Sequence, residues 1–233
     1  MHFLHPSADP VNALLQTIRG AFEYQGQKCS ATSRLFAPCS LWPQIKEGLL
    51  RDVPKIKPDS DPSSLMGALV SEAAFDKTVF YIESAKQRGA ELLCGGTYDK
   101  SIGYFVSPTV FLTDSLDFVT MREEIFGPVL TCYVYEDQEW ESVLKQAADD
   151  CQYGLTAGFF ATSRTAISTA TRILRHAAGN LYINDKCTGA MVGAQPFGGS
   201  RHSGTNDKAG SYLNLLRWTS PRCIKENFIP LSK

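Results

Sequence analysis

Short segments rich in β-branched and aromatic residues alternate with segments of helical periodicity along most of the chain. Residues 129–135 have the composition of a strand, and residues 72–87 place Phe75, Val79 and Ile82 on one helical stripe. This alternation predicts an α/β domain with a largely parallel sheet. The predicted strands are 33–39, 90–94, 104–112, 129–135, 155–161 and 181–184; the predicted helices are 41–56, 72–87, 139–148, 163–176 and one that begins near Asp9 with Ser7 as its cap.

Composition and charge narrow the class of protein. The chain has 233 residues, of which 43% are hydrophobic and 20% charged, and its formal net charge is −1. This length suffices for one large domain or two small ones. No run of Lys and Arg occurs, so we expect no nucleic-acid partner. No apolar run approaches the roughly 18 residues that span a bilayer, so we expect no membrane association.

The cysteines and histidines show no spacing typical of a metal site. The seven cysteines contain no CxxC pair, and the four histidines show no ligand pattern, so we expect reduced thiols, no bound metal, and histidines with structural or surface roles. The N-terminal residues resemble neither a secretory signal nor an Arg-rich transit peptide, which leaves the cytosol as an expected location.

Cys29 is the residue most suited to chemistry. It lies where the first predicted helix ends in Gly26 and a strand begins near Ser33, beside Lys28. A thiolate is the nucleophilic form of cysteine, and a nearby positive charge favours it. From these residues alone, a buried and inert core cysteine remains the alternative.

Three motifs indicate a family. The run 22–31 around Cys29, the run Met-Arg-Glu-Glu-Ile-Phe-Gly-Pro-Val at 121–129 and the run Gln-Pro-Phe-Gly-Gly-Ser-Arg-His-Ser-Gly at 195–204 resemble the aldehyde dehydrogenase superfamily. The runs 182–186 and 203–208 are similar to its L-glutamate γ-semialdehyde (Δ1-pyrroline-5-carboxylate) dehydrogenase branch, which acts in proline catabolism. The resemblance implies a three-layer α/β catalytic domain over residues 1–212 and an oligomerisation tail over 213–233, with an edge strand at 216–226 that carries Pro221.

The resemblance also implies an activity and its first site residues. The activity is the NAD-dependent oxidation of L-glutamate γ-semialdehyde to glutamate, with Cys29 as nucleophile, through a thiohemiacetal and a thioester. Glu124 matches a carboxylate that binds the nicotinamide-side ribose, and Phe126 matches an aromatic residue beside that ribose. Without the flanking motif, Glu123 and Glu124 would read as an acidic helix N-terminus or a solvated loop.

Substrate contacts follow from the same resemblance. Gly189, Ala190 and Phe197 match a substrate-binding loop, in which the backbone and a serine anchor the α-carboxylate of the substrate, and Ser30 matches the serine after the nucleophile that assists them. Ala190 departs from the branch pattern, which has serine there, and a lost hydroxyl removes a hydrogen bond to a charged group. A core aromatic residue is the alternative interpretation of Phe197.

One part of the family pattern is missing. The Glu-Leu-Gly-Gly-Lys block, which carries the general-base glutamate, does not occur in the chain, nor does the upstream nucleotide-binding domain. We therefore expect a truncated chain that is inactive alone. The alternatives are a non-catalytic protein that associates with full-length subunits and a cysteine esterase or acyl-transferase that works without NAD. By resemblance, we expect a homo-oligomer and a mitochondrial matrix location.

Overall fold

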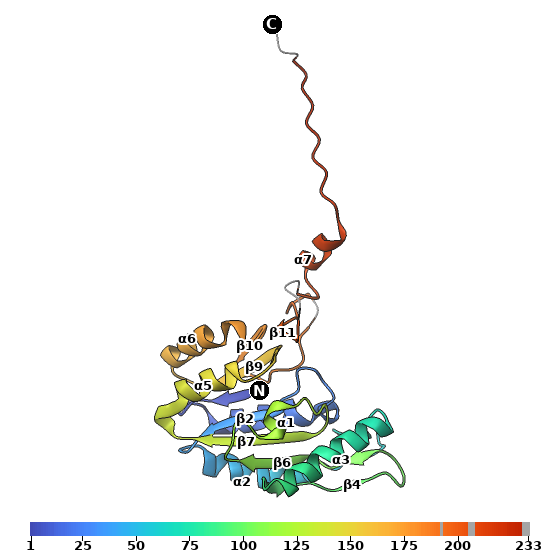
Figure 1. The fold of residues 1–233 in the computed structure, drawn as a ribbon, viewed down its shortest axis with the longest axis vertical. Coiled ribbons are helices and arrows are strands. Elements are labelled where there is room, and N and C mark those ends of the chain that lie inside the picture. The colour runs from blue at the N-terminus through green and yellow to red at the C-terminus, as the bar shows by residue number, and fades with distance from the viewer. Residues whose placement is uncertain (192, 205–207, 230–233) are drawn as a thin grey trace.

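The computed structural model describes residues 1–191, 193–204 and 208–229; residues 205–207, inside the predicted 203–208 motif, and 230–233, at the end of the predicted tail, lie outside the described residues. Its centre is a seven-stranded sheet in the order β10-β9-β1-β2-β7-β6-β3 (Figure 1). Every neighbouring pair is parallel except β3 and β6, which are antiparallel. The predicted α/β class with a largely parallel sheet is therefore confirmed.

The strands of this sheet are β1 (His2–Leu4), β2 (Arg34–Pro38), β3 (Glu91–Cys94), β6 (Thr109–Thr113), β7 (Val129–Tyr135), β9 (Thr156–Phe160) and β10 (Asn180–Ile183). Two small ribbons pair β4 (Tyr98–Asp99) with β5 (Phe105–Val106), and β8 (Tyr153–Gly154) with β11 (Ser200–Arg201). The α-helices are α1 (Pro10–Phe22), α2 (Trp42–Asp52), α3 (Glu72–Gln87), α4 (Val119–Arg122), α5 (Trp140–Asp149), α6 (Arg164–Ile173) and α7 (Tyr212–Leu215). Short 3-10 turns are Glu23–Gly26, Val53–Lys55, Asp137–Glu139, Leu174–His176 and Leu216–Trp218.

Helices cover both faces of the sheet because side chains of a strand alternate between the faces. In β1, Phe3 packs with residues of α5 and α6, whereas Leu4 packs with residues of α1 and α2. In β6, Phe111 packs with α3, while Val110 faces α1 and α2. The result is three layers, with α1 and α2 on one face and α3, α5 and α6 on the other.

The sequence analysis missed β1, an interior strand of the sheet. It has three residues and pairs with both β2 and β9. Three residues are too few to show an alternating pattern, so this strand can be recognised only from its backbone pairing in the structure. The expected helix cap was also wrong: Asp9 caps α1 by accepting from the N–H groups of Val11 and Asn12. Ser7 instead accepts from the N–H groups that follow β9.

Two predicted strands differ from the structure. The segment 104–112 divides into β5 and β6, and Pro108, which has no N–H to donate, separates them. The strand expected at 216–226 was wrong: residues 216–218 form a 3-10 turn, and residues 219–229 form neither strand nor helix. An edge strand needs the backbone of a neighbour, and the described part of this chain offers none to the tail.

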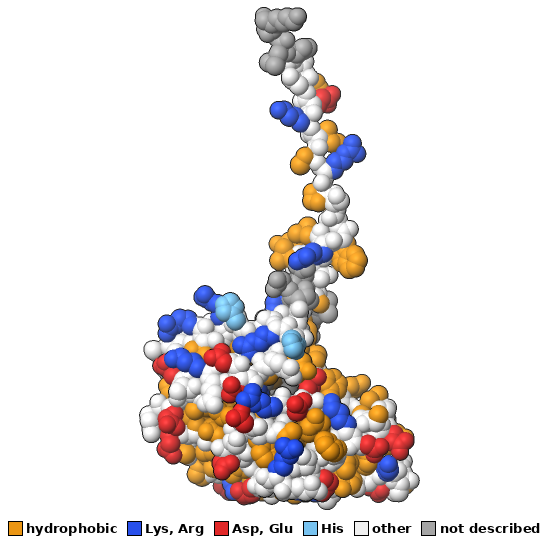
Figure 2. Space-filling model, in the orientation of Figure 1, with side chains coloured by type: hydrophobic (Ala, Val, Ile, Leu, Met, Phe, Trp, Pro, Cys, Tyr) orange, Lys and Arg blue, Asp and Glu red, His pale blue; other side chains and the backbone are white. Residues whose placement is uncertain are grey.

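The tail projects away from the sheet and carries exposed apolar side chains along its length (Figures 1 and 2). The largest of these, by exposed fraction, are Trp218, Phe228, Ile229, Ile224 and Tyr212. Among the described residues, no helix is long and apolar enough to cross a membrane.

Candidate active site around Cys29

A left-handed turn precedes Cys29, which lies at the surface. After α1 the backbone passes through Tyr24, Gln25 and Gly26, whose φ angles are +56°, +57° and +65°. Non-glycine residues rarely adopt such angles, and strain of this kind clusters at functional sites. Two side-chain contacts hold the turn: Gln25 Nε2 donates to the carbonyl of Ala68 (2.9 Å), and Gln27 Oε1 accepts from the N–H of Val70 (2.9 Å).

Cys29 lies exposed in the turn between this segment and β2, as the sequence predicted for a reactive thiol. The alternative of a buried core cysteine is wrong for this residue. Its own backbone N–H donates to no acceptor among the described residues. A free N–H beside the thiol is a ready donor to an oxyanion.

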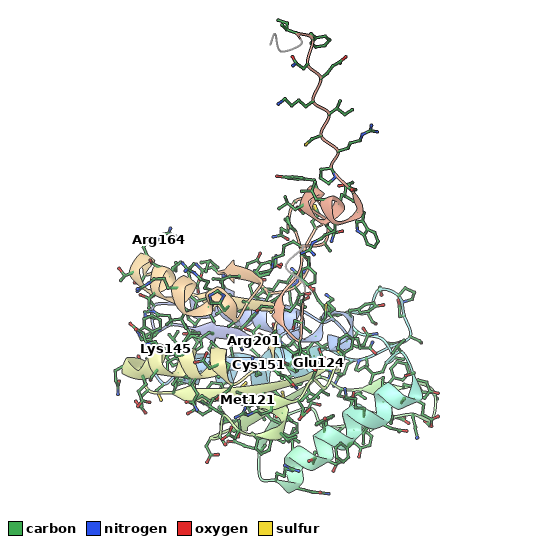
Figure 3. The ribbon with its side chains drawn as sticks, turned by 45° about the horizontal axis from the view of Figure 1, so that its top comes forward. Met121, Glu124, Lys145, Cys151, Arg164 and Arg201 are labelled. Carbon is green, nitrogen blue, oxygen red and sulfur yellow. The ribbon has the colours of Figure 1, made fainter. Side chains whose placement is uncertain are left out.

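The thiol borders a cavity of about 310 Å³, a size that accommodates small ligands. All three sequence motifs contribute to its walls: Cys29 from the first, Glu124 and Phe126 from the second, and His202 and Ser203 from the third. Figure 3 shows Met121, Glu124 and Cys151, which line the cavity, near one another, together with Arg201. The cavity lies at the amino ends of the parallel strands, since its walls include residues that directly precede β2, β7 and β9.

Glu124 and Phe126 stand in a loop that follows α4 and leads into β7. They are not at a helix N-terminus, so that part of the alternative interpretation is wrong, whereas its other part, an exposed loop, describes where both glutamates lie. Glu123 caps the C-terminal end of α4. The carboxylate of Glu124 is exposed and forms no ion pair among the described residues. Phe126 has φ +62° and a 41% exposed side chain.

The expected substrate residues lie outside the cavity wall. Ser30 is buried and its hydroxyl donates to Thr188 Oγ1 (2.9 Å), which brings the loop after β10 against the Cys29 turn. The backbone N–H groups of Gly189 and Ala190, next in that loop, donate to no acceptor among the described residues. Phe197 is half-buried and forms a backbone bridge with Ala209.

Comparison with known proteins identifies the family. The model of the aldehyde dehydrogenase family matches residues 1–223. The chain belongs to the aldehyde dehydrogenase family. It is 56% identical over 234 residues to the mitochondrial Delta-1-pyrroline-5-carboxylate dehydrogenase of Dictyostelium discoideum, covering 99% of this chain and 42% of that protein. The human mitochondrial protein of the same name is 47% identical, with 99% and 42% covered.

Solved structures give the same result. The Delta-pyrroline-5-carboxylate dehydrogenase of Mycobacterium tuberculosis, in a structure bound with NAD and cobalamin, matches with a TM-score of 0.90 and 46% identity. That match covers 100% of this chain and 43% of the other. A Thermus 1-pyrroline-5-carboxylate dehydrogenase with bound NAD matches at 36% identity and a TM-score of 0.85, covering 93% and 41%. The chain thus spans about two fifths of the length of the relatives it matches.

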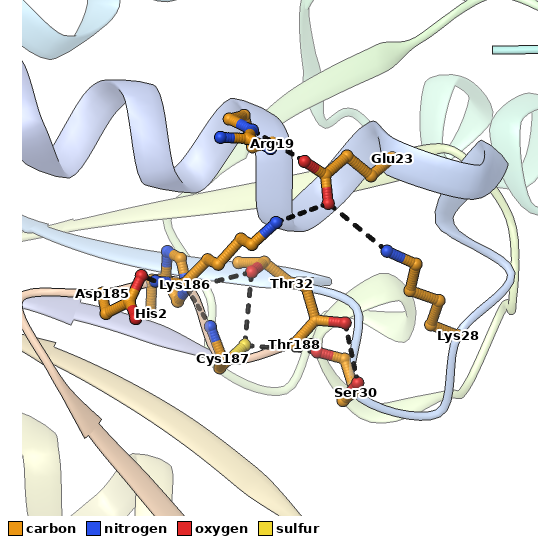
Figure 4. A network of polar contacts seen from close by, with 10 residues as sticks. All are labelled: His2, Arg19, Glu23, Lys28, Ser30, Thr32, Asp185, Lys186, Cys187 and Thr188. Carbon is orange, nitrogen blue, oxygen red and sulfur yellow. Dashed lines mark hydrogen bonds and ion pairs between the residues drawn. The ribbon is translucent and has the colours of Figure 1, made fainter. Parts of the chain in front are cut away.

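A cluster of charges joins the Cys29 turn to the loop that follows β10. Glu23 lies at the end of α1 and pairs with Arg19 (2.7 Å), Lys186 (2.7 Å) and Lys28 (3.4 Å) (Figure 4). Burial raises the pKa of Glu23, but the hydrogen bonds from Lys186 and Arg19 outweigh it and hold the pKa below its ordinary value. Lys28 is therefore partly neutralised by Glu23, although three cations around one carboxylate leave the cluster positive.

Sequence reasoning missed several residues of the site. Arg34 and Cys151 line the cavity but belong to none of the three motifs. His2, Thr32 and Cys187 form a buried polar group beneath the Cys29 turn (Figure 4). Of these, only Cys187 had a sequence signal, since it directly follows the 182–186 run.

The left-handed turn gives a first prediction. A Cβ at Gly26 would lie 2.5 Å from the carbonyl oxygen of Gly127, and the φ of +65° adds strain. Gly26→Ala is expected to lower the free energy of unfolding by at least about 3 kcal/mol, because the backbone must move. Gly89→Ala is the matched control: its φ is +89° but no atom lies within 4 Å of the added Cβ, so only the strain of about 1–2 kcal/mol is expected. Urea titrations measure both free energies of unfolding. Equal decreases in Gly26→Ala and Gly89→Ala would contradict the close contact at Gly26.

Glu23 gives a pH-dependent prediction. Because its pKa is lowered in the folded protein, its ion pairs stabilise the fold above the ordinary pKa of 4.5 and are lost as the pH falls through the folded pKa. The difference in stability between the wild type and Glu23→Gln should be constant from about pH 8 to 6 and should shrink below pH 4.5. Thermal unfolding of the wild type and of Glu23→Gln at several pH values measures this difference. A difference that is unchanged at pH 3 would show that the pairs do not stabilise the fold.

Proposed function

We propose that this chain carries the thiol and the substrate loop of a dehydrogenase that oxidises L-glutamate γ-semialdehyde to glutamate with NAD. One observation carries the proposal: an exposed Cys29 shares a cavity with Glu124 and Phe126. The similarity to relatives named Delta-1-pyrroline-5-carboxylate dehydrogenase supports the choice of substrate. Because the chain spans about two fifths of their length, the remaining parts of the site lie in segments that these residues do not include.

The thiolate of Cys29 would attack the aldehyde carbon and form a thiohemiacetal, whose oxyanion the free N–H of Cys29 would stabilise. Loss of a hydride from this intermediate, to the acceptor that NAD would supply when bound, would leave a thioester on Cys29, and water would then hydrolyse it to the acid and the free thiol. The water needs a general base, which the family resemblance places in a block absent from this sequence. We therefore propose that the chain alone does not turn over.

The residues present fit NAD. Glu124 offers an exposed carboxylate with no ion-pair partner among the described residues, and a carboxylate accepts hydrogen bonds from both hydroxyls of a ribose. Phe126 presents a partly exposed ring two residues away. When bound, NAD would supply the hydride acceptor; Glu124 and Phe126 would hold its nicotinamide-side ribose.

The substrate loop suits a carboxylate. The N–H groups of Gly189 and Ala190 have no acceptor in the part of the chain that the structure describes, and an anion can accept from both. The Ser30 hydroxyl donates to Thr188, so its further role would be to accept from or rearrange toward the substrate. Phe197 would border the aldehyde chain. We propose a mitochondrial location, since the names of several relatives include that word, and the matrix in particular from the family resemblance.

A chimera tests the proposed function. Residues 1–233 would replace the corresponding segment of the Mycobacterium tuberculosis dehydrogenase, and NADH formation from glutamate semialdehyde would be followed by absorbance. The chimera should form NADH, and Cys29→Ser should lower kcat by about 10³-fold or more. A chimera that folds and binds NAD but leaves the aldehyde unoxidised would contradict the proposal. The unfused chain serves as the comparison and should form no NADH.

Ala190 gives a quantitative prediction in the same chimera. Restoring the hydroxyl with Ala190→Ser should lower the KM for glutamate semialdehyde about tenfold, which corresponds to one hydrogen bond of about 1.4 kcal/mol. The KM for NAD is the internal control and should not change. An unaltered KM for the aldehyde would mean that the backbone donors and Ser30 suffice.

A second candidate function is association with other subunits of the family. The observation in its favour is the tail of residues 213–229, whose apolar side chains are exposed and which forms no strand by itself. We propose that the tail completes a sheet edge of a second copy or of a full-length relative. Light scattering should give an oligomer for the whole chain and a monomer after removal of residues 213–233; a monomer in both cases would contradict it.

A further inference from the structure

A buried chain of polar contacts joins the Cys29 turn to the substrate loop (Figure 4). Cys187 stands at its centre. Its Sγ lies 3.3 Å from the carbonyl oxygen of Ser30 and 3.3 Å from Thr32 Oγ1, and its N–H lies 3.2 Å from His2 Nε2. Cys187 and His2 are fully buried, and Ser30 and Thr32 nearly so.

The donors and acceptors of this group fix its protonation. The backbone N–H of Cys187 can only donate, so His2 Nε2 must accept and carries no proton. The proton of the neutral ring is then on Nδ1, which donates to Thr17 Oγ1 (2.9 Å). Thr32 Oγ1 also lies 3.1 Å from this unprotonated Nε2, so the Thr32 hydroxyl donates to His2, and the thiol of Cys187 can donate to the carbonyl of Ser30.

A charged alternative fits the contacts less well. Burial raises the pKa of the Cys187 thiol, while a charged Met1 ammonium and a charged His2 lower it to about 5. Burial also lowers the pKa of the Met1 ammonium, which weakens that influence. A thiolate would face the carbonyl oxygen of Ser30, and a protonated Nε2 would face the N–H of Cys187. Both contacts would be repulsive, so the geometry assigns a neutral thiol and a neutral imidazole.

Ser30 is thereby held at two points. Its carbonyl accepts from the thiol of Cys187, and its hydroxyl donates to Thr188, the next residue of the same loop. Cys29 itself forms no hydrogen bond among the described residues, so its position depends on its neighbour. Breaking a buried contact leaves an unsatisfied group, which is costly enough to keep the arrangement closed.

We propose that Cys187 is a positioning residue, which locks the Cys29 turn against the substrate loop by holding the carbonyl of Ser30. This inference rests on the proposed function, in which the two loops carry the nucleophile and bind the substrate carboxylate. It states that residues 26–33 and residues 184–191 are held together through Cys187.

Hydrogen exchange of the full chain, without substrate or NAD, tests the coupling. In Cys187→Ala, peptides that cover 26–33 and 184–191 should exchange about tenfold faster than in the wild type, because the buried contacts are lost. Cys187→Ser keeps a donor and an acceptor and should restore most of the protection. Cys132→Ala is the matched control: Cys132 is equally buried, but it packs among the apolar side chains between the sheet and helices α1 and α2.

The outcomes separate cleanly. Faster exchange confined to the two loops, present in Cys187→Ala and absent in Cys132→Ala, supports the proposal. Unchanged loops in Cys187→Ala, equal loosening in both alanine variants, or no recovery in Cys187→Ser would overturn it. If Cys187→Ala does not fold, Thr188→Val removes the acceptor of Ser30 and should loosen the same two peptides. Because no catalysis is measured, an inactive chimera would leave this result standing.

Discussion

The close contact between Gly26 and Gly127 is the constraint on which the candidate site depends. The two backbones approach so closely that a Cβ at Gly26 would lie 2.5 Å from the Gly127 carbonyl oxygen. This contact requires the left-handed turn before Cys29, and it brings that turn beside the loop of Phe126, itself at φ +62°. Two strained loops are held together here by the packed sheet beneath them, which is how a fold retains strain at a functional site.

The position of the cavity follows from this contact rather than from the general behaviour of parallel sheets. Ligands of open α/β sheets usually bind beyond the carboxyl ends of the strands. Here the segments that precede β2, β7 and β9 form the cavity, at the amino ends. The ribbon of β8 and β11 brings the third motif to the same place, since His202 and Ser203 follow β11 directly. Three segments that are distant in sequence therefore meet at one thiol.

Periodicity and composition predicted the bounds of α3 and β7, because long apolar stripes and β-branched runs are strong local signals. Periodicity and composition could not reveal β1, because its three residues form a strand only through pairing with β2 on one side and β9 on the other. The strand predicted in the tail was wrong for the opposite reason: the alternation of residues is a local signal, but a strand also needs a neighbouring strand with which to pair.

At the site, the motifs identified Cys29, Glu124 and Phe126, and the structure shows that all three line one cavity. The pairing of Lys186 with Glu23 and the contact of Cys187 with Ser30 each join residues more than 150 positions apart, so no short sequence window contains both partners.

The central claim is that Cys29 is the reactive thiol of this chain, and competitive alkylation tests it most directly. Iodoacetamide at limiting concentration, followed by peptide mapping, gives relative rates for all seven cysteines. Cys39 and Cys223 are the exposed references: Cys39 donates to Glu136, and burial together with that carboxylate raises its pKa, while Cys223 lies in the exposed tail. Cys29 should be labelled faster than either, because a positive cluster lies beside it and its own N–H has no acceptor among the described residues. Labelling of Cys29 no faster than Cys223 would contradict the account.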